Sequence, residues 1–292
     1  MIFMQRLVFF FLAFFLLTSP VWAEEVSEIT QEPTIQATEA ADPNLKTSII
    51  WERERLDQEI ATIKATYQSQ LETYLYQDKL YRIAYDQHKQ LQTLVSIEDL
   101  TQKAKTLGIS RDDVLISYLD LLRLNLIATE GIELSLKAEY LTQLETTIDY
   151  MKNHQENLKN LSNRDQVALS LSTFTADQQN IEKLANGVLV LLSVGNLQII
   201  YDKAVALKTD IDAYLNIKGT FNLPEIDRAS KETNRSLNSA KLKLDTFWAD
   251  ALNYGGKSGY LASFYDNLPS EMNPVYVNLS QSISYLSELL SI

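Results

Sequence analysis

The chain contains 292 residues, with no cysteine, 8 glycines, 6 prolines and a formal net charge of −12. This length allows one large or two ordinary domains, and so few glycines and prolines disfavour an all-β sandwich or barrel. A chain without cysteine has no disulfide, no thiolate metal site and no cysteine nucleophile. Because proteins that follow a nucleic-acid backbone need clustered positive charge, we expect no nucleic-acid partner.

The first 23 residues have the pattern of a secretory signal peptide. Arg6 precedes an apolar run at residues 7–17, Pro20 follows the run, and Ala23 provides a small residue for cleavage. The run is shorter than the roughly 20 apolar residues that cross a bilayer. We therefore expect cleavage near Ala23 and a secreted or extracytoplasmic protein. An uncleaved N-terminal anchor is the alternative.

An acidic segment follows at residues 24–44. It contains six acidic residues, no basic residue and two prolines, and it shows neither a helical nor a strand period. Such a segment buries too little apolar surface to offset the entropy lost on ordering. We expect a disordered linker here and a helical bundle domain over residues 45–292.

The first long helix is predicted over residues 45–95. Apolar and aromatic residues recur in it with a spacing of seven, as in a coiled coil, but the middle of the seam is polar. Tyrosine is favoured at contacts that stay partly hydrated. The residues expected to form a contact seam are Tyr67, Gln70, Tyr74, Gln77, Tyr81 and His88. The seam joins either two helices of this chain or this chain and a partner.

The helical period continues to the end of the chain. A short helix is expected from Ser96 to Gly108, and Ser110, with Asp112 and Asp113 after it, starts the next long helix. The later helices are predicted at residues 110–161, 163–216, 224–254 and 274–291, and the last has an apolar stripe of Tyr276, Leu279, Ile283, Leu286 and Leu290. Short connections favour antiparallel neighbours. The predicted fold is all-α, an elongated bundle of long antiparallel amphipathic helices with coiled-coil-like segments.

Motifs for phosphate and metal binding are incomplete. Residues 251–258 fit a relaxed phosphate-loop pattern, but a helix and not a strand precedes them. Asp210 and Asp212 begin like a calcium loop, yet Phe221 stands where a bidentate glutamate is needed. His88 and His154 have no regularly spaced ligand partner. We expect no metal and no cofactor.

Enzymatic chemistry also has few candidates. A Ser–His–acid set has to form in space, and the chain has two histidines and no Gly-x-Ser-x-Gly elbow. Paired carboxylates are abundant, but solvated helix faces explain most acidic residues. We name no catalytic residue and expect no enzyme activity, with a secreted carboxylate-dependent hydrolase as the second alternative.

One uncharged apolar segment, Leu184–Tyr201, lies within the third long helix. Asn186 and Gln198 make it polar for a solitary membrane span, and two glycines favour close packing inside a bundle. The alternative is an element that inserts into a membrane after release. The residues with that candidate role are Leu184, Val188, Leu191, Leu192 and Ile199.

The helical architecture with one apolar segment is similar in kind to that of the cytolysin A family of α-helical pore-forming toxins. Residues 240–244 (AKLKL) look like a stretch of that family. Its toxins have a longer apolar element, richer in Gly and Ala. The resemblance implies a membrane-active or pore-forming protein that inserts Leu184–Tyr201.

The leading functional prediction is an exported, non-enzymatic helical scaffold or interaction protein. It rests on the signal segment, the acidic linker and the long helices without a complete catalytic motif. Such a protein presents a long helical surface to a protein or cell-envelope partner. Self-association is a further possibility, and membrane contact belongs to the pore-forming alternative.

Overall fold

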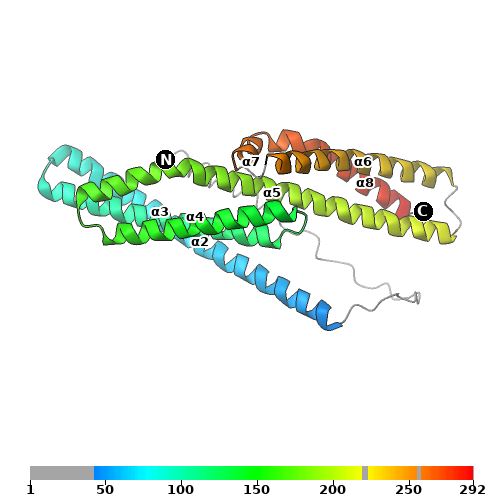
Figure 1. The fold of residues 1–292 in the computed structure, drawn as a ribbon, viewed down its shortest axis with the longest axis horizontal. Coiled ribbons are helices and arrows are strands. Elements are labelled where there is room, and N and C mark those ends of the chain that lie inside the picture. Colours follow the sequence, from blue (N-terminus) through cyan, green and yellow to red (C-terminus); the bar gives the residue numbers. More distant parts are fainter. Residues whose placement is uncertain (1–42, 219–222, 255–257, 292) are drawn as a thin grey trace. The chain divides into compact units, whose positions relative to one another are not determined.

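In this computed structural model, residues 43–218, 223–254 and 258–291 are described, and they form helices and no strand. The all-α prediction is confirmed (Figure 1). The helices are α2 (Pro43–Leu91), α3 (Leu94–Ala128), α4 (Leu134–Asn160), α5 (Arg164–Lys218), α6 (Pro224–Asn253), α7 (Ser258–Tyr265) and α8 (Leu268–Ser291). The predicted signal peptide, and the predicted linker up to residue 42, lie outside the described residues.

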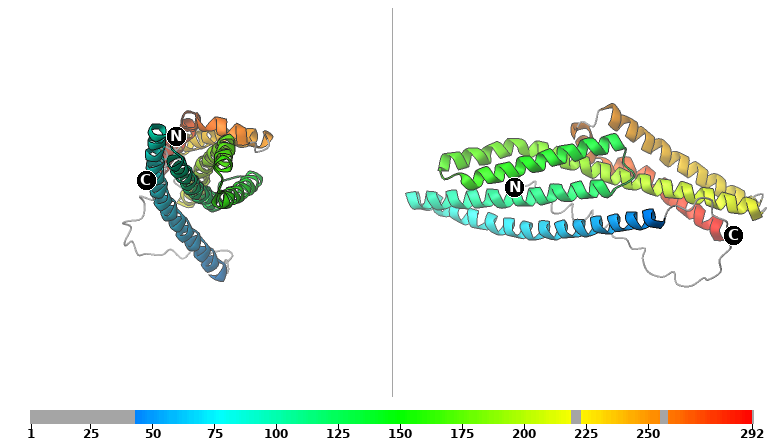
Figure 2. Two further views of the ribbon diagram at one scale, coloured as in Figure 1. Left: turned by 90° about the vertical axis from the view of Figure 1, so that its left-hand side faces the viewer. Right: turned by 60° about the horizontal axis from the view of Figure 1, so that its bottom comes forward.

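The chain divides into two compact units, Met1–Thr47 and Ser48–Ile292. Among the described residues, the first unit contains only the start of α2. Within the second unit, α3, α4 and α5 pack against one another, and α5 also packs against α6, α7 and α8. Helix α5 therefore belongs to both groups of helices, as Figures 1 and 2 show. Helices α6 and α8 lie side by side.

The turn between α2 and α3 corrects the first predicted boundary. Helix α2 ends at Leu91 instead of residue 95, and Gln92 adopts a left-handed φ of 49°. The N-cap of α3 is Thr93, and its side chain accepts a hydrogen bond from the Ser96 amide, while the Ser96 hydroxyl accepts one from the Thr93 amide. Ser96 is thus the third residue of a capping box and not the cap itself.

Helix α3 runs through Gly108 and Ser110, where the sequence predicts a helix end and a new start. A Cβ added at Gly108 would lie 2.7 Å from Cδ2 of Leu158 in α4 and 2.7 Å from Cδ2 of Leu171 in α5. The glycine therefore allows close approach of three helices, which is a packing role that local sequence does not distinguish from helix termination. The Ser110 hydroxyl donates to the Leu107 carbonyl within the continuous helix.

The predicted helix 110–161 is wrong, because α3 ends at Ala128 and α4 starts at Leu134. Side chains satisfy the exposed backbone groups at this break. The Glu133 carboxylate accepts hydrogen bonds from the Ser135 hydroxyl and from the Leu136 and Ser135 amides, and these bonds lower the pKa of Glu133. Lys137 Nζ donates to the carbonyls of Ile127 and Thr129, 2.8 and 2.9 Å away. Caps of this kind contribute about 1 kcal/mol each.

The α3–α4 connection packs closely on α5 through two glycines. A Cβ added at Gly131 would lie 2.2 Å from the carbonyl oxygen of Gly195. A Cβ added at Gly195 would lie 2.5 Å from Cγ1 of Ile132, a side chain that is 4% exposed. Further along α5, Gly187 faces the ring of Tyr140 in α4 at 2.8 Å on the same measure. Glycines inside α5 thus permit contacts that any side chain would block.

The two C-terminal helices differ in how well their buried faces follow the sequence period. In α6, apolar residues at spacings of three and four, from Ile226 to Ala251, are buried. Helix α8 begins at Leu268, earlier than the predicted residue 274, and Pro274 lies inside it. Its buried residues are Met272, Val275, Leu279, Ser282, Leu286 and Leu289. Tyr276, Ile283 and Leu290, which the sequence places in the buried stripe, are 64%, 48% and 63% exposed.

The glycine contact predicts that Gly131→Ala destabilises the protein. The added methyl meets a backbone carbonyl that has no rotamer to escape into, so we expect a loss of about 1–3 kcal/mol in the free energy of unfolding. Gly259→Ala is the matched control, because its Cβ meets nothing within 4 Å and Ala is the better helix former. Urea denaturation of both variants checks this. Equal stabilities would contradict the packing role.

Candidate functional site

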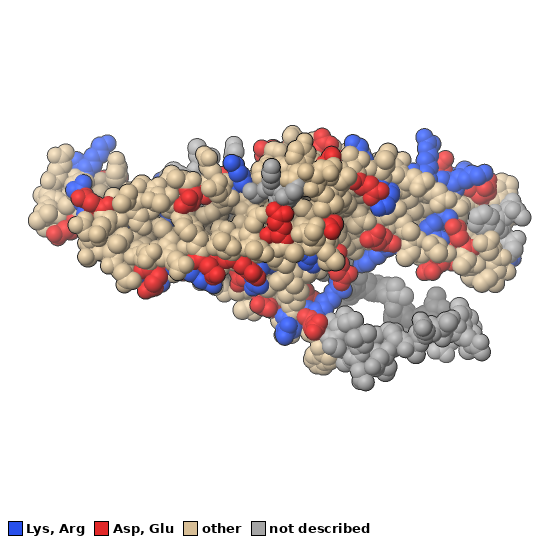
Figure 3. Space-filling view, in the orientation of Figure 1, with Lys and Arg blue, Asp and Glu red and all other residues tan. Residues whose placement is uncertain are grey.

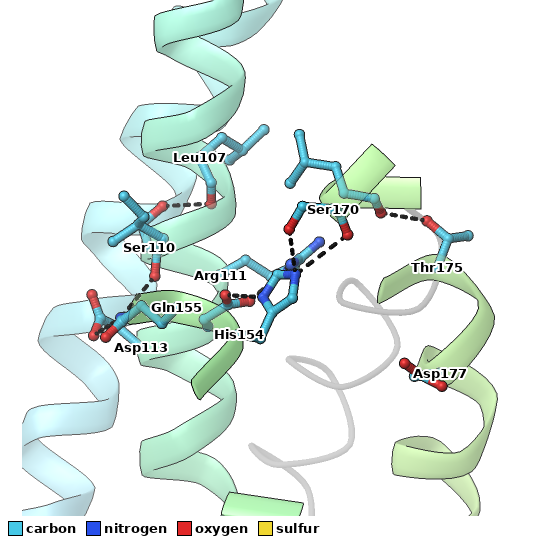
Figure 4. Close-up of polar contacts among 12 residues, drawn as sticks. Leu107, Ser110, Arg111, Asp113, His154, Gln155, Ser170, Thr175 and Asp177 are labelled. Carbon is cyan, nitrogen blue, oxygen red and sulfur yellow. Dashed lines mark hydrogen bonds and ion pairs between the residues drawn. The ribbon is translucent and has the colours of Figure 1, made fainter. Parts of the chain in front are cut away.

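A cluster of polar side chains joins α3, α4 and α5 and is the strongest candidate for a chemical site. Asp112 of α3 is 0% exposed, and His154 of α4 is 9% exposed. Ser170 of α5 lies beside His154 (Figure 4). Each lies on the inward face of its helix, since buried residues flank it at spacings of three and four. The flanking residues are Leu115 in α3, Met151 and Leu158 in α4, and Val167 and Phe174 in α5.

The three side chains are connected in the order carboxylate, imidazole, hydroxyl. His154 Nδ1 lies 2.6 Å from Asp112 Oδ2. His154 Nε2 lies 3.1 Å from Ser170 Oγ and 3.3 Å from the Ser170 carbonyl oxygen. This is the connectivity that serine hydrolases use, formed from residues that are far apart in the chain.

The buried carboxylate of Asp112 is also paired with the guanidinium group of Arg111. Arg111 donates from Nε and Nη2 to Asp112 Oδ1, at 3.1 and 2.8 Å. The carbon of its guanidinium group lies 3.3 Å from the ring centroid of Phe174 in α5. The ring of His154 lies 5.8 Å from the same Phe174 ring. The buried charge of Asp112 is therefore paired on both oxygens, which is the condition under which a buried carboxylate is tolerated.

The surroundings of His154 favour its protonated form. The hydrogen bond to Asp112 raises the pKa of His154 above its ordinary value, although burial acts in the opposite direction. A protonated imidazole donates from both nitrogens. It thus donates to Asp112 from Nδ1 and to the Ser170 carbonyl or hydroxyl oxygen from Nε2.

This arrangement suits a structural link better than nucleophilic catalysis. Ser170 is the seventh residue of α5, so the amides around it are engaged in the helical hydrogen-bond ladder. An oxyanion hole needs backbone amides or other donors free to point at the reacting oxygen. The cluster therefore holds three helices together by charge-assisted hydrogen bonds.

Two further contacts connect the same helices. Gln155 Nε2 donates to Asp113 Oδ1 at 2.6 Å and to the Ile109 carbonyl at 3.2 Å, which ties α4 to α3. The hydroxyl of Tyr150 in α4 donates to the Asp177 carboxylate in α5. Burial, and then the hydrogen bond to Asp177, raise the pKa of Tyr150 to about 12.

The seam predicted on the first helix is the less exposed side of α2. Tyr67 is 4% exposed, and its ring centroid lies 5.9 Å from that of Tyr118 in α3. Burial raises the pKa of Tyr67 to about 12. The side-chain oxygen of Gln70 is buried and has no hydrogen-bond partner among the described residues. Residues Tyr74, Gln77 and Tyr81 are half-buried.

The end of the seam also faces this chain. His88 Nδ1 lies 3.0 Å from the hydroxyl of Ser96 at the start of α3. At Tyr67 and at His88, therefore, the seam contacts α3, which is the intramolecular alternative. Partner binding through the rest of the seam stays a prediction.

The apolar segment Leu184–Tyr201 lies in the middle of α5. Leu184, Val188, Leu191 and Leu192 are 0–4% exposed, and Ile199 is half-buried. By length and composition, α5 is the one helix in the described part of the chain that could cross a membrane, and half of its most apolar window is buried. Close packing at Gly187 and Gly195 accounts for the glycines in this segment.

A pocket of about 350 Å³ lies between α3 and α4 and has Asp120, Glu145 and Asp149 in its lining. Asp120 accepts a hydrogen bond from Arg123 at 2.8 Å, and Asp149 lies 3.7 Å from Lys152. Carboxylates paired with a cation of their own helix are typical of a solvated helix surface. Among the described residues, no group of three His, Asp or Glu side chains is arranged to hold a metal ion.

The motifs at the ends of α6 and α5 lie partly outside the described residues. Helix α6 continues to Asn253, and residues 255–257 of the phosphate-loop pattern are not described. Phe221, which stands at the final position of the calcium-loop pattern, also lies outside the described part.

Sequence reasoning missed the roles of Asp112 and Ser170. Asp112 reads as a solvated residue at a helix start because Gly108 and Ser110 resemble a helix boundary. If the helix is continued through Gly108, Asp112 falls in line with Leu115 and Leu119, both buried. A polar residue on an apolar stripe of each of three helices was the available signal.

No protein-family model matches the chain. No curated protein is significantly similar to it. No solved structure is significantly similar to it either.

The raised pKa of His154 predicts a pH-dependent stability. Stabilisation from a raised pKa is complete below the unfolded value of about 6.5 and is lost as pH rises through the higher pKa of the folded state. We expect the free energy of unfolding of the wild type to fall as pH rises above about 6.5, and His154→Gln to lack this decline. At pH 6, His154→Gln should be less stable by about 1–3 kcal/mol.

Urea denaturation from pH 5.5 to 9 measures both slopes. Ser170→Ala is the control and should keep most of the wild-type slope, because the bond to Asp112 is the largest cause of the shift. If wild type and His154→Gln change equally with pH, His154 does not form the charged link.

Proposed function

We propose that the protein is an exported helical binding protein whose outward α8 face packs against a helix of a cell-envelope partner protein. Three observations support this proposal: an uncharged exposed face on α8, the heptad spacing of its large side chains, and the secretory pattern at residues 1–23. The exposed α8 face is the observation that carries it.

The outward face of α8 carries no charged residue from position 273 to 291. The exposed residues of α8 in this range are Asn273, Pro274, Tyr276, Val277, Ser280, Gln281, Ile283, Ser284, Ser287, Leu290 and Ser291. Glu288 is the one charged residue in this part of the helix, and its carboxylate pairs with Arg228 of α6. The charge is thus directed to the neighbouring helix and not to the outward face.

The neighbouring helix shows how an ordinary solvated face differs. The exposed residues of α6 include Glu225, Arg228, Lys231, Arg235 and Lys243, with Leu242 as an isolated apolar residue. Figure 3 shows charges of both signs mixed over the face in view. Scattered single apolar residues are normal on a protein surface, whereas an uncharged face with large apolar side chains at regular spacing is typical of an interaction site.

The spacing of the row favours a helix as the binding element. Tyr276, Ile283 and Leu290 repeat every seven residues, and serines fill the positions between them. The large side chains at heptad spacing can insert between the side chains of a partner helix, as in a coiled coil. The small serines between them permit close approach of that helix. This face therefore has large side chains that can contact a partner helix and small ones that leave room for its side chains.

The proposal keeps the predicted scaffold function but moves its contact surface. The predicted seam on α2 contacts α3 at Tyr67 and at His88, whereas Tyr276, Ile283 and Leu290 are at least 48% exposed. Membrane insertion of Leu184–Tyr201 is less well supported, because Val188 and Leu191 are fully buried and would have to leave the core. Each buried aliphatic side chain contributes roughly 1.5–3 kcal/mol to the folded state.

The proposal predicts a position-specific crosslink. With a photo-crosslinking residue at Ser284, exposed on the α8 face, mature protein added to its native envelope fraction should crosslink to a discrete partner. Ile283→Asp should lower that yield at least tenfold without unfolding the chain, since Ile283 is 48% exposed and its replacement should cost only about 1 kcal/mol of stability.

Leu242→Asp is the matched control, because Leu242 is 70% exposed on α6, and it should leave the crosslink unchanged. A crosslinking residue at Ser239, exposed on α6, should give no discrete product. Equal yields from Ser239 and Ser284, or a product made only of two copies of this chain, would contradict the proposal.

A further inference from the structure

The turn between α2 and α3 exposes three aliphatic side chains next to one another. Leu91, the last residue of α2, is 64% exposed, and Leu94 and Val95, the first two residues of α3, are each 74% exposed. These residues form what we call the aliphatic turn. The core of the protein does not need them, because none of the three is buried. Exposing apolar side chains to water is unfavourable, and a group of them close together is typical of a surface that binds something else.

Four backbone amides on either side of Leu94 and Val95 are hydrogen-bonded within the turn. The Gln92 amide donates to the His88 carbonyl at 2.9 Å, and the Ile97 amide donates to the Thr93 carbonyl at 3.1 Å. The amides of Thr93 and Ser96 donate to each other's side chains, at 3.0 and 3.2 Å. These bonds lower the cost of moving the flanking amides of the turn into a partly dehydrated interface.

Rigid side chains support the same turn. The Ser96 hydroxyl donates to the Thr93 carbonyl at 2.8 Å and also contacts His88 Nδ1 at 3.0 Å. Ser96 is 8% exposed, so its polar group is covered while the aliphatic residues face outward. The turn is thus ordered before any contact, which lowers the entropy lost on binding.

The charges around the turn select the kind of surface. Residues 90–97 contain no charged side chain, and Lys89, Glu98 and Asp99 are the nearest charged residues along the chain. The two acidic residues lie in the first turns of α3 and would be repelled by an anionic layer. A neutral interface accepts the apolar side chains without this repulsion.

We infer that the aliphatic turn inserts into the interface of a zwitterionic lipid bilayer. Leu91, Leu94 and Val95 enter the boundary between headgroups and acyl chains, while Glu98 and Asp99 stay in water and limit the depth. The three residues lie where one helix ends and the next begins, and a lipid interface receives such a turn without a preformed groove. This contact is independent of the α8 face.

Phosphatidylcholine vesicles test the inference. Because the mature chain has no cysteine, Val95→Cys carries a single environment-sensitive fluorophore on the turn. Its emission should shift to the blue when vesicles are added. In a flotation assay, Leu94→Asp should reduce vesicle-bound protein at least tenfold. This variant should remain folded, since Leu94 is exposed and a carboxylate favours a helix N-terminus.

Leu134 provides a matched control. It is the first residue of α4, as Leu94 is of α3, and it is 79% exposed, but Glu130 and Glu133 precede it. Leu134→Asp should leave flotation unchanged, and a fluorophore at Leu134→Cys should not shift.

Three results would overturn the inference. The first is an absence of flotation at millimolar lipid. The second is binding that requires anionic lipid. The third is a concentration-dependent shift at position 95 without vesicles, which would assign the turn to contact between copies. The crosslinking of the α8 face is measured separately, so failure of either proposal leaves the other standing.

Discussion

Burial of the uncharged middle of α5 is the constraint on which the other helices depend. Val188, Val190, Leu191 and Val194 are fully buried, so several helices must cover a single stretch of one helix. A helix that is apolar on most faces is stable only when other elements surround it. Helices α3 and α4 pack against α5, and α6, α7 and α8 also pack against it.

Close packing around α5 depends on glycines, which have no side chain at the contact, as well as on side chains that fit together. Gly187 admits the ring of Tyr140, and Gly195 admits Ile132. Gly108 does the same in α3, where Leu158 and Leu171 approach it. Glycine costs about 0.5–1 kcal/mol inside a helix, and the buried contacts that it permits offset this cost. Among the described glycines, Gly108, Gly131, Gly187 and Gly195 therefore lie where helices or their connections meet, whereas Gly259 does not.

The sequence predicts helices well where an apolar period is regular and poorly where tertiary contacts decide. The stripe of α6 from Ile226 to Ala251 is visible in sequence because its opposite face is charged. The break between Ala128 and Leu134 is not, because Glu133 and Lys137 satisfy the helix ends through side chains that helix interiors also contain. In α8 both faces contain large apolar residues, so periodicity alone does not separate the buried residues from the exposed ones.

The cluster around His154 shows the same limit for sites. Residues 112, 154 and 170 meet only because three helices take particular positions, and no spacing in the chain encodes the hydrogen bonds between them. The sequence does contain a polar residue on each of three otherwise apolar helix faces. Local pattern and side-chain polarity disagree at these positions, and the hydrogen bonds between the three buried groups account for this. The exposed surfaces show the opposite case, in which apolar side chains occupy positions that face water. On the outward α8 face and at the aliphatic turn, apolar side chains remain in water although the core is complete without them. Folding of this chain does not require either surface, and this is why we propose a binding role for each of them.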